Sequence, residues 1–136
     1  LAVLILGLNL ICLACGAGGI AVIGESVEWG GLLRYHGALL LMQLEIGAVC
    51  FGLSAFLRRG GLGLAMGLAA LLYFAGVLIN LDGGLDWLRF VTPYYYADAG
   101  RVLDGEALAG PILAGCALGA LGAGAGLWWY GRKDIA

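Results

Sequence analysis

Long uncharged runs alternate with short polar stretches along this chain. Residues 1–24, 62–81 and 107–131 carry no Asp, Glu, Lys or Arg, and residues 35–57 carry only Glu45. An α-helix rises ~1.5 Å per residue, so about 20 apolar residues cross the ~30 Å hydrocarbon core of a bilayer. The runs also lack the polar stripe that a water-facing helix shows. The pattern therefore predicts an all-α, polytopic membrane helix bundle.

Four membrane-spanning helices are predicted from these runs, at residues 2–23, 35–57, 62–80 and 109–130. The connections at 24–34 and 81–108 then lie on one side of the membrane. The connection at 58–61 lies on the other side, together with both chain ends. That second side carries four candidate cytoplasmic anchors, Arg58, Arg59, Arg132 and Lys133. Because basic residues favour the cytoplasmic side, we expect this side to face the cytoplasm and the more acidic side to face outward.

The connection at 81–108 is long but far from polar. Residues 85–90 have the pattern of a short amphipathic turn. Pro93 interrupts it, because proline has no N–H and disfavours helical geometry in the preceding residue. Residues 94–101 then begin a second short helix. Since long structureless loops are rare, we expect two short helices that fold back onto the outer membrane surface before the last span.

The composition agrees with a membrane protein and excludes several functions. The chain is 62% hydrophobic and 12% charged, against about 25% charged residues in soluble domains. A net charge of −2 gives no reason to expect a nucleic-acid partner. Cys12 and Cys15 have C-x-x-C spacing, but no charged residue lies near them in the sequence, so we interpret them as small helix-face residues. With one His and no catalytic motif, we expect neither an enzyme nor a metal or cofactor site.

Small residues recur at helical spacing in two of the predicted spans. Such faces let helix backbones approach closely in lipid. The predicted helix-packing residues are Gly63 and Gly67 in the third span and Gly115, Gly119, Gly122 and Gly126 in the last. The packing could occur within one protomer or between two, and the same faces could also slide during a transport cycle.

Glu45 is the one charged residue within a predicted span, and a carboxyl group there is a functional candidate by default. Two simpler interpretations remain open, namely that Glu45 is protonated or that it forms a hydrogen bond to a neighbouring helix. Asn9 and Asn80 are expected to form hydrogen bonds across helices.

The stretch from 58 to 134 resembles the C-terminal half of a bacterial ATP-binding-cassette (ABC) transporter permease of the second exporter type. The resemblance rests on Leu-Tyr-Phe-Ala-Gly at 72–76 followed by the segment 85–90, on Thr-Pro-Tyr-Tyr-Tyr-Ala-Asp-Ala at 92–99, and on Gly-Arg-Lys-Asp-Ile at 131–135. The second motif is similar to a Pro-aromatic element that precedes the last span in that family. The first two predicted spans fit the preceding family helices in order and spacing.

The resemblance implies a six-span subunit that pairs with a second permease subunit and with cytoplasmic ABC ATPase subunits in the bacterial plasma membrane. Residues 1–136 would then be one transmembrane permease domain, either the C-terminal part of such a subunit or a reduced relative. The family's principal ATPase-docking segment has no counterpart here. The candidate path or outer-gate residues are Glu45, Pro93, Tyr95, Asp98 and Arg101.

Two other functions fit the same hydropathy pattern. The first is a small four-helix membrane scaffold or assembly protein without transport activity, which would need no ordered Pro-aromatic element in its outer loop. The second is a proton-coupled small exporter, which would rest on Glu45 alone. The sequence does not identify a transported substrate, nor does it distinguish a homodimer from a heterodimer.

Overall fold

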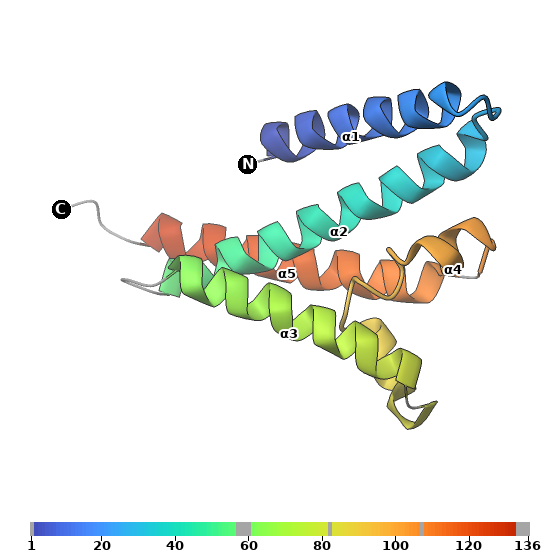
Figure 1. Ribbon diagram of the computed structural model, residues 1–136. Coiled ribbons are helices and arrows are strands. Elements are labelled where there is room, and N and C mark those ends of the chain that lie inside the picture. The colour runs from blue at the N-terminus through green and yellow to red at the C-terminus, as the bar shows by residue number, and fades with distance from the viewer. Residues whose placement is uncertain (1, 57–60, 82, 107, 133–136) are drawn as a thin grey trace.

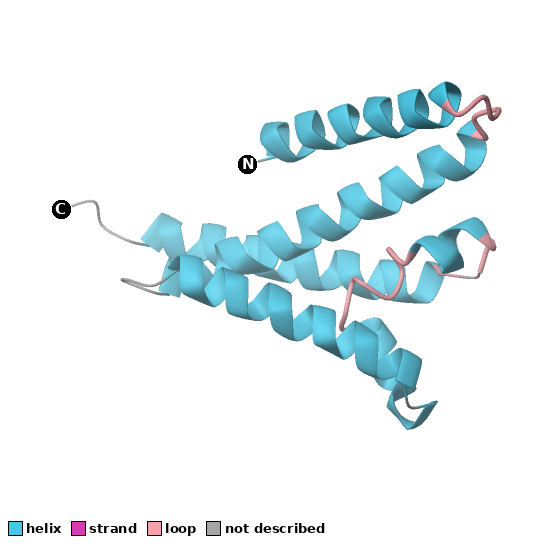
Figure 2. Ribbon diagram, in the orientation of Figure 1, coloured by secondary structure: helices cyan, strands magenta, loops and turns pink. Residues whose placement is uncertain are grey.

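The computed structural model describes residues 2–56, 61–81, 83–106 and 108–132. The described residues form five α-helices and one 3₁₀ helix and contain no strand (Figures 1 and 2). In chain order these are α1 (Ala2–Val22), α2 (Trp29–Phe56), α3 (Gly61–Leu81), η1 (Gly83–Phe90), α4 (Ala99–Leu103) and α5 (Ala109–Arg132). Helices α1, α2, α3 and α5 are long and apolar enough to cross a membrane. The predicted all-α fold with four spans is confirmed.

One predicted boundary is wrong, because α2 begins at Trp29 rather than at residue 35. Gly24 has φ +80 and ends the turn that follows α1. The Leu32 N–H then donates to the Glu28 carbonyl at 3.1 Å, which starts the next helix after a short connection. Arg34 lies in this extra helical length with its side chain exposed. Residues 29–34 were left out of the predicted span because Arg34 interrupts the uncharged run.

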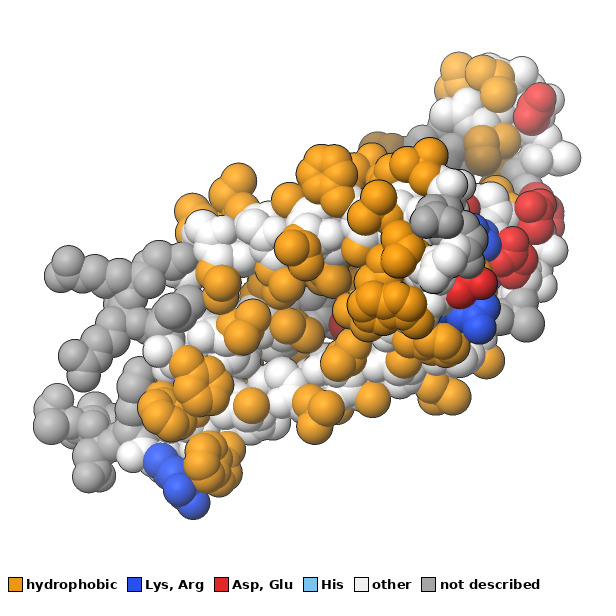
Figure 3. Space-filling view, turned by 90° about the horizontal axis from the view of Figure 1, so that it is seen from below, with side chains coloured by type: hydrophobic (Ala, Val, Ile, Leu, Met, Phe, Trp, Pro, Cys, Tyr) orange, Lys and Arg blue, Asp and Glu red, His pale blue; other side chains and the backbone are white. Residues whose placement is uncertain are grey.

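The four long helices lie side by side, and the chain reverses direction between them (Figure 1). The described chain ends lie at one end of the bundle, and the α1–α2 connection and α4 lie at the other. Acidic side chains gather at that second end, as Figure 3 shows. At the first end, the Arg132 guanidinium lies 4.0 Å from the Trp128 ring centre. The other predicted anchors, Arg58, Arg59 and Lys133, lie outside the described residues.

Helix α2 is the centre of the bundle and contacts α1, α3, α4 and α5. Large hydrophobic side chains point outward from all four long helices, with Leu4 76%, Leu62 77% and Leu121 70% exposed. In water such surfaces would drive aggregation, whereas lipid tails solvate them. The bundle is therefore built for a bilayer, and its tightest packing is confined to the side of α2 that meets α5.

The predicted orientation can be tested by thiol labelling of intact cells. In a chain whose four native cysteines are replaced by Ala, Asp104→Cys at the α4 end should react with a membrane-impermeant maleimide added outside. Arg132→Cys at the opposite end should react only after the cells are broken. A mass-shift gel measures both reactions, and labelling of Arg132→Cys alone from outside would mean that the orientation is inverted.

Candidate functional site

Residues 91–98, which we call the cap segment, fold into the bundle rather than onto its surface. Thr92 and Tyr96 are each 1% exposed, and Pro93 is also fully buried. The Val91 and Thr92 N–H groups both donate to the Leu88 carbonyl at the end of η1, and Pro93 prevents the helix from continuing. The Thr92 hydroxyl donates to the Leu72 carbonyl of α3 at 2.7 Å. This bond fixes the start of the cap segment to α3.

The cap segment is fixed to α2 by a hydrogen bond inside the bundle. The Tyr96 hydroxyl donates to Glu45 Oε2 at 2.6 Å, and the Glu45 side chain lies buried at 7% exposure. Burial raises the pKa of the Tyr96 phenol, and the hydrogen bond to Glu45 raises it further, so the phenol keeps its proton and acts as donor. The Glu45 carboxyl group therefore has the partner that a polar group in a span needs.

Helix α5 provides the space that the Glu45 side chain occupies. A Cβ atom at Gly115 would lie 2.9 Å from Glu45 Cδ, closer than real Cβ contacts. Only glycine at this position leaves room for the carboxyl group between the two helices. Three elements thus meet at Glu45: α2 carries it, the cap segment donates to it and α5 makes room for it.

A second, more exposed cluster surrounds Arg101 on α4. Its guanidinium donates to the Tyr95 hydroxyl at 3.1 Å, to Glu106 Oε2 at 3.0 Å and to Asn80 Oδ1 at 2.9 Å. The same group lies 4.2 Å from the Tyr95 ring centre. Asp98 caps the first turn of α4 by accepting the Arg101 backbone N–H at 3.2 Å. The cluster fixes α4 to the C-terminal end of α3.

The structure places the five candidate gate residues in three places. Tyr95, Asp98 and Arg101 lie together in the cluster around Arg101, whereas Glu45 lies in the buried contact with Tyr96. Pro93 lies in the buried turn at the start of the cap segment. Tyr96 and Thr92 were not among the residues predicted for the site. The sequence does contain a signal for Tyr96. A carboxyl group in a span requires a hydrogen-bond donor, and each of the three consecutive tyrosines at 94–96 carries a hydroxyl group.

The four predicted glycines of the last span all face α2. Gly115, Gly119 and Gly126 are buried, and a Cβ at Gly122 would lie 2.8 Å from Val49 Cα. On the other side of this contact, sequence analysis missed Gly52 of α2, where a Cβ would lie 2.8 Å from the Gly122 carbonyl carbon. The two backbones approach so closely only because glycines face each other. We call this contact the α2–α5 seam.

The two predicted packing glycines of α3 have no such contact. A Cβ at Gly63 or Gly67 would have no described atom within 4 Å. In the part of the chain that the structure describes, this face of α3 is open, so the close approach predicted there does not occur within the protomer. Two glycines four residues apart allow a helix to pack closely, but they do not determine whether a neighbouring helix packs against them.

The two asparagines confirm the predicted cross-helix hydrogen bonds. Asn9 Nδ2 in α1 donates to Gln43 Oε1 in α2 at 2.7 Å. Asn80 at the end of α3 accepts from Arg101 in α4. These bonds connect α1 to α2 and α3 to α4.

Among the described residues, no group of three or more His, Cys, Asp or Glu side chains is placed to hold a metal ion. The groups at the site form hydrogen bonds that fix the cap segment to three surrounding helices. Neither a known family model, nor a curated protein, nor a solved structure matches this chain, so the family resemblance remains a prediction.

Proposed function

We propose that this chain is the membrane-spanning permease part of an ABC exporter in a bacterial plasma membrane, driven by a separate cytoplasmic ATPase. The single observation that carries the proposal is the buried cap segment at the outer end of the bundle. A scaffold that only holds partners in the membrane needs no outer segment inserted between its helices. A permease needs such a segment, because the outer end of its path has to close between transport events.

The way the cap segment is attached also supports the proposal. Its contacts to the long helices include two side-chain hydrogen bonds, Thr92 to Leu72 and Tyr96 to Glu45, and α4, which follows it, adds a third from Arg101 to Asn80. Hydrogen bonds of this kind are worth about 0.5–1.5 kcal/mol each, so they can break and re-form within a cycle. In the α2–α5 seam, by contrast, the two helix backbones contact each other directly. Helices α2 and α5 would therefore move together as one rigid body.

In the proposed cycle, the ATPase subunits close on ATP and shift two permease subunits between inward-facing and outward-facing states. The open faces of α1 and α3 leave room for the second permease subunit, which is either identical or a paralogue. The cap segments would close the outer end of the shared path. No residue of this chain is assigned to ATPase docking.

The proposal predicts that an ATPase subunit co-purifies with this protein. The native gene is tagged at its 3′ end, the membrane is extracted in mild detergent, and mass spectrometry gives both the intact mass and the associated proteins. We expect a nucleotide-binding subunit and a second permease subunit, absent from a parallel purification of an unrelated multispan protein. A free-standing protein of 14.0 kDa without an ATPase would instead support the scaffold.

A further inference from the structure

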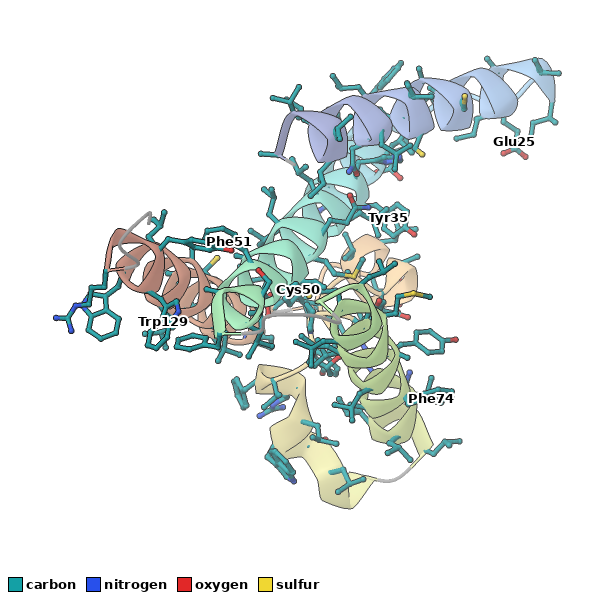
Figure 4. The ribbon with its side chains drawn as sticks, turned by 90° about the vertical axis from the view of Figure 1, so that its left-hand side faces the viewer. Glu25, Tyr35, Cys50, Phe51, Phe74 and Trp129 are labelled. Atoms are coloured by element: carbon teal, nitrogen blue, oxygen red, sulfur yellow. The ribbon has the colours of Figure 1, made fainter. Side chains whose placement is uncertain are left out.

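The 3₁₀ helix η1 lies at the edge of the bundle, next to the end of α3. Helix α3 is long and apolar enough to cross a membrane and ends at Leu81, and η1 begins two residues later, at Gly83. Helix η1 packs against α3 and α5. In Figure 4 its pale yellow ribbon lies beside α3, on the side of the bundle away from α1. We therefore expect η1 to lie where the hydrocarbon core of the bilayer meets the headgroups.

Large apolar side chains point outward from η1 and the residue after it. Trp87 is 62% exposed, and Phe90 and Val91 are each 41% exposed. Leu85 and Leu88, by contrast, are half-buried. Tryptophan favours the boundary between membrane and water, because its ring is apolar and its N–H is polar. A short helix with such side chains on its outward face is suited to lie in the plane of the membrane surface.

Arg89 lies among these apolar side chains and lacks an anionic partner. Its Nε atom is the one buried side-chain nitrogen or oxygen in the described structure without a hydrogen bond. The guanidinium carbon lies 4.9 Å from the Phe90 ring centre. Asp86 of the same helix is exposed, and no ion pair joins it to Arg89 in the described part of the chain. Because a buried charged group without a partner is costly, the guanidinium group is suited to an acceptor from outside the chain.

Two other arginines at this end of the bundle already have acceptors. Arg34 Nε donates to the Gly30 carbonyl at 3.3 Å, and Arg101 donates to three side chains of the cluster described above. Arg89 has no such bond, and its terminal nitrogens are not buried. A guanidinium group binds phosphate by two parallel hydrogen bonds, and phospholipids carry phosphate at the depth that tryptophan prefers. The position and the chemistry of Arg89 thus match a lipid phosphate.

We propose that Arg89 binds the phosphate group of a membrane phospholipid, while Trp87 and Phe90 lie against its acyl chains. The positive charge is delocalised over the guanidinium group, so an anion at the terminal nitrogens compensates the whole group. The Thr92 N–H donates to the Leu88 carbonyl, so a lipid bound here also holds the start of the cap segment. This inference goes beyond the proposed transport function and does not rest on it, because η1 and a phospholipid are sufficient for the contact.

The test uses Trp87 as a local reporter, because it lies two residues from Arg89. In the full chain, Trp29, Trp128 and Trp129 are replaced by Phe, and the protein is purified in a neutral maltoside detergent, which contains no phosphate. Phosphatidylglycerol with bromine atoms near the headgroup end of its acyl chains is added, and quenching of the tryptophan fluorescence measures binding. We expect saturable quenching, with about tenfold tighter binding than for a galactosyl diacylglycerol that has the same brominated chains and no phosphate.

Two variants of Arg89 test its role. Arg89→Gln removes the charge and should weaken phosphatidylglycerol binding about tenfold, to the level of the galactolipid. Arg89→Lys keeps the charge but loses the paired hydrogen bonds, so it should retain part of the affinity. Arg34→Gln is the matched control. It removes another exposed arginine at the same end of the bundle and should leave the quenching of Trp87 unchanged.

Three outcomes would overturn the inference. Equal binding of phosphatidylglycerol and the galactolipid would mean that η1 recognises only the acyl chains. Unchanged phosphatidylglycerol binding in Arg89→Gln would mean that the phosphate is held elsewhere. Displacement of the lipid by an equal concentration of inorganic phosphate would mean that the site binds the free ion rather than the lipid. Because no ATPase is present, each result is independent of the co-purification experiment.

Discussion

Gly122→Ala should destabilise the bundle, although alanine is the better helix former. The added Cβ atom would lie 2.8 Å from Val49 Cα and 2.9 Å from the Ala48 carbonyl oxygen. Both neighbours are backbone atoms, so no side-chain rotation can relieve the contact and the two helices have to separate. Overpacking in a core typically costs about 1–3 kcal/mol, and we expect a loss at the upper end of that range. Thermal unfolding in detergent, followed by the fluorescence of Trp128 and Trp129, measures it.

Gly124→Ala is the control for this experiment. Gly124 lies in the same helix two residues away, and no described atom lies within 4 Å of its Cβ position. Glycine costs about 0.8–1.0 kcal/mol relative to alanine in a helix interior, so this change should be neutral or stabilising. Gly122→Ala is thus expected to lower the unfolding temperature, and Gly124→Ala to leave it unchanged or raise it. Equal shifts would mean that the α2–α5 seam is not the packing core of the bundle.

Tyr96→Phe should release the cap segment from α2. The substitution removes the hydroxyl that donates to Glu45 Oε2 and leaves a buried carboxyl group without that donor. An unsatisfied buried polar group costs about 1–3 kcal/mol. We expect this loss in unfolding free energy, together with faster amide hydrogen exchange in residues 91–98. Tyr94→Phe is the matched control, because it removes the hydroxyl of a neighbouring tyrosine and keeps the ring that packs on Tyr73.

Variants of Glu45 separate its structural role from a proton-carrying role. Glu45→Gln keeps an oxygen that can accept the Tyr96 hydroxyl, so we expect the cap segment to stay in place. Glu45→Leu removes the acceptor and should destabilise the protein about as much as Tyr96→Phe, with little further loss in the double variant. If Glu45→Gln transports with unaltered pH dependence, proton coupling through this residue is excluded. Additive losses in the double variant would show that the two side chains act separately.

The four spans could be predicted from sequence because a bilayer imposes length and polarity on any helix that crosses it. The start of α2 could not, because residues such as Arg34 extend the helix beyond the apolar run. The packing partners of the glycines could not be predicted from the sequence either. Gly63 and Gly67 show the same i, i+4 spacing as Gly115 and Gly119, yet only the second pair meets a neighbouring helix.

The site was predictable in outline but not in its central contact. The Pro-aromatic pattern indicated an ordered outer element, and Arg101 was expected within it. Three consecutive tyrosines look alike in sequence, and only the turn after Pro93 determines that Tyr96 points inward while Tyr95 lies against Arg101. The partner of Glu45 is 51 residues away in the chain, and no local pattern links the two.

The distance along the chain between Glu45 and Tyr96 has a consequence for the synthesis of the protein. Glu45 leaves the ribosome 51 residues before Tyr96. At ~5–20 residues per second, Glu45 leaves the ribosome about 3–10 s before its hydrogen-bond donor does. During this interval the leucines around Glu45 have to offset the cost of inserting a carboxyl group. The helix therefore has to be apolar enough to be inserted by itself, and docking of residues 91–98 can only follow insertion.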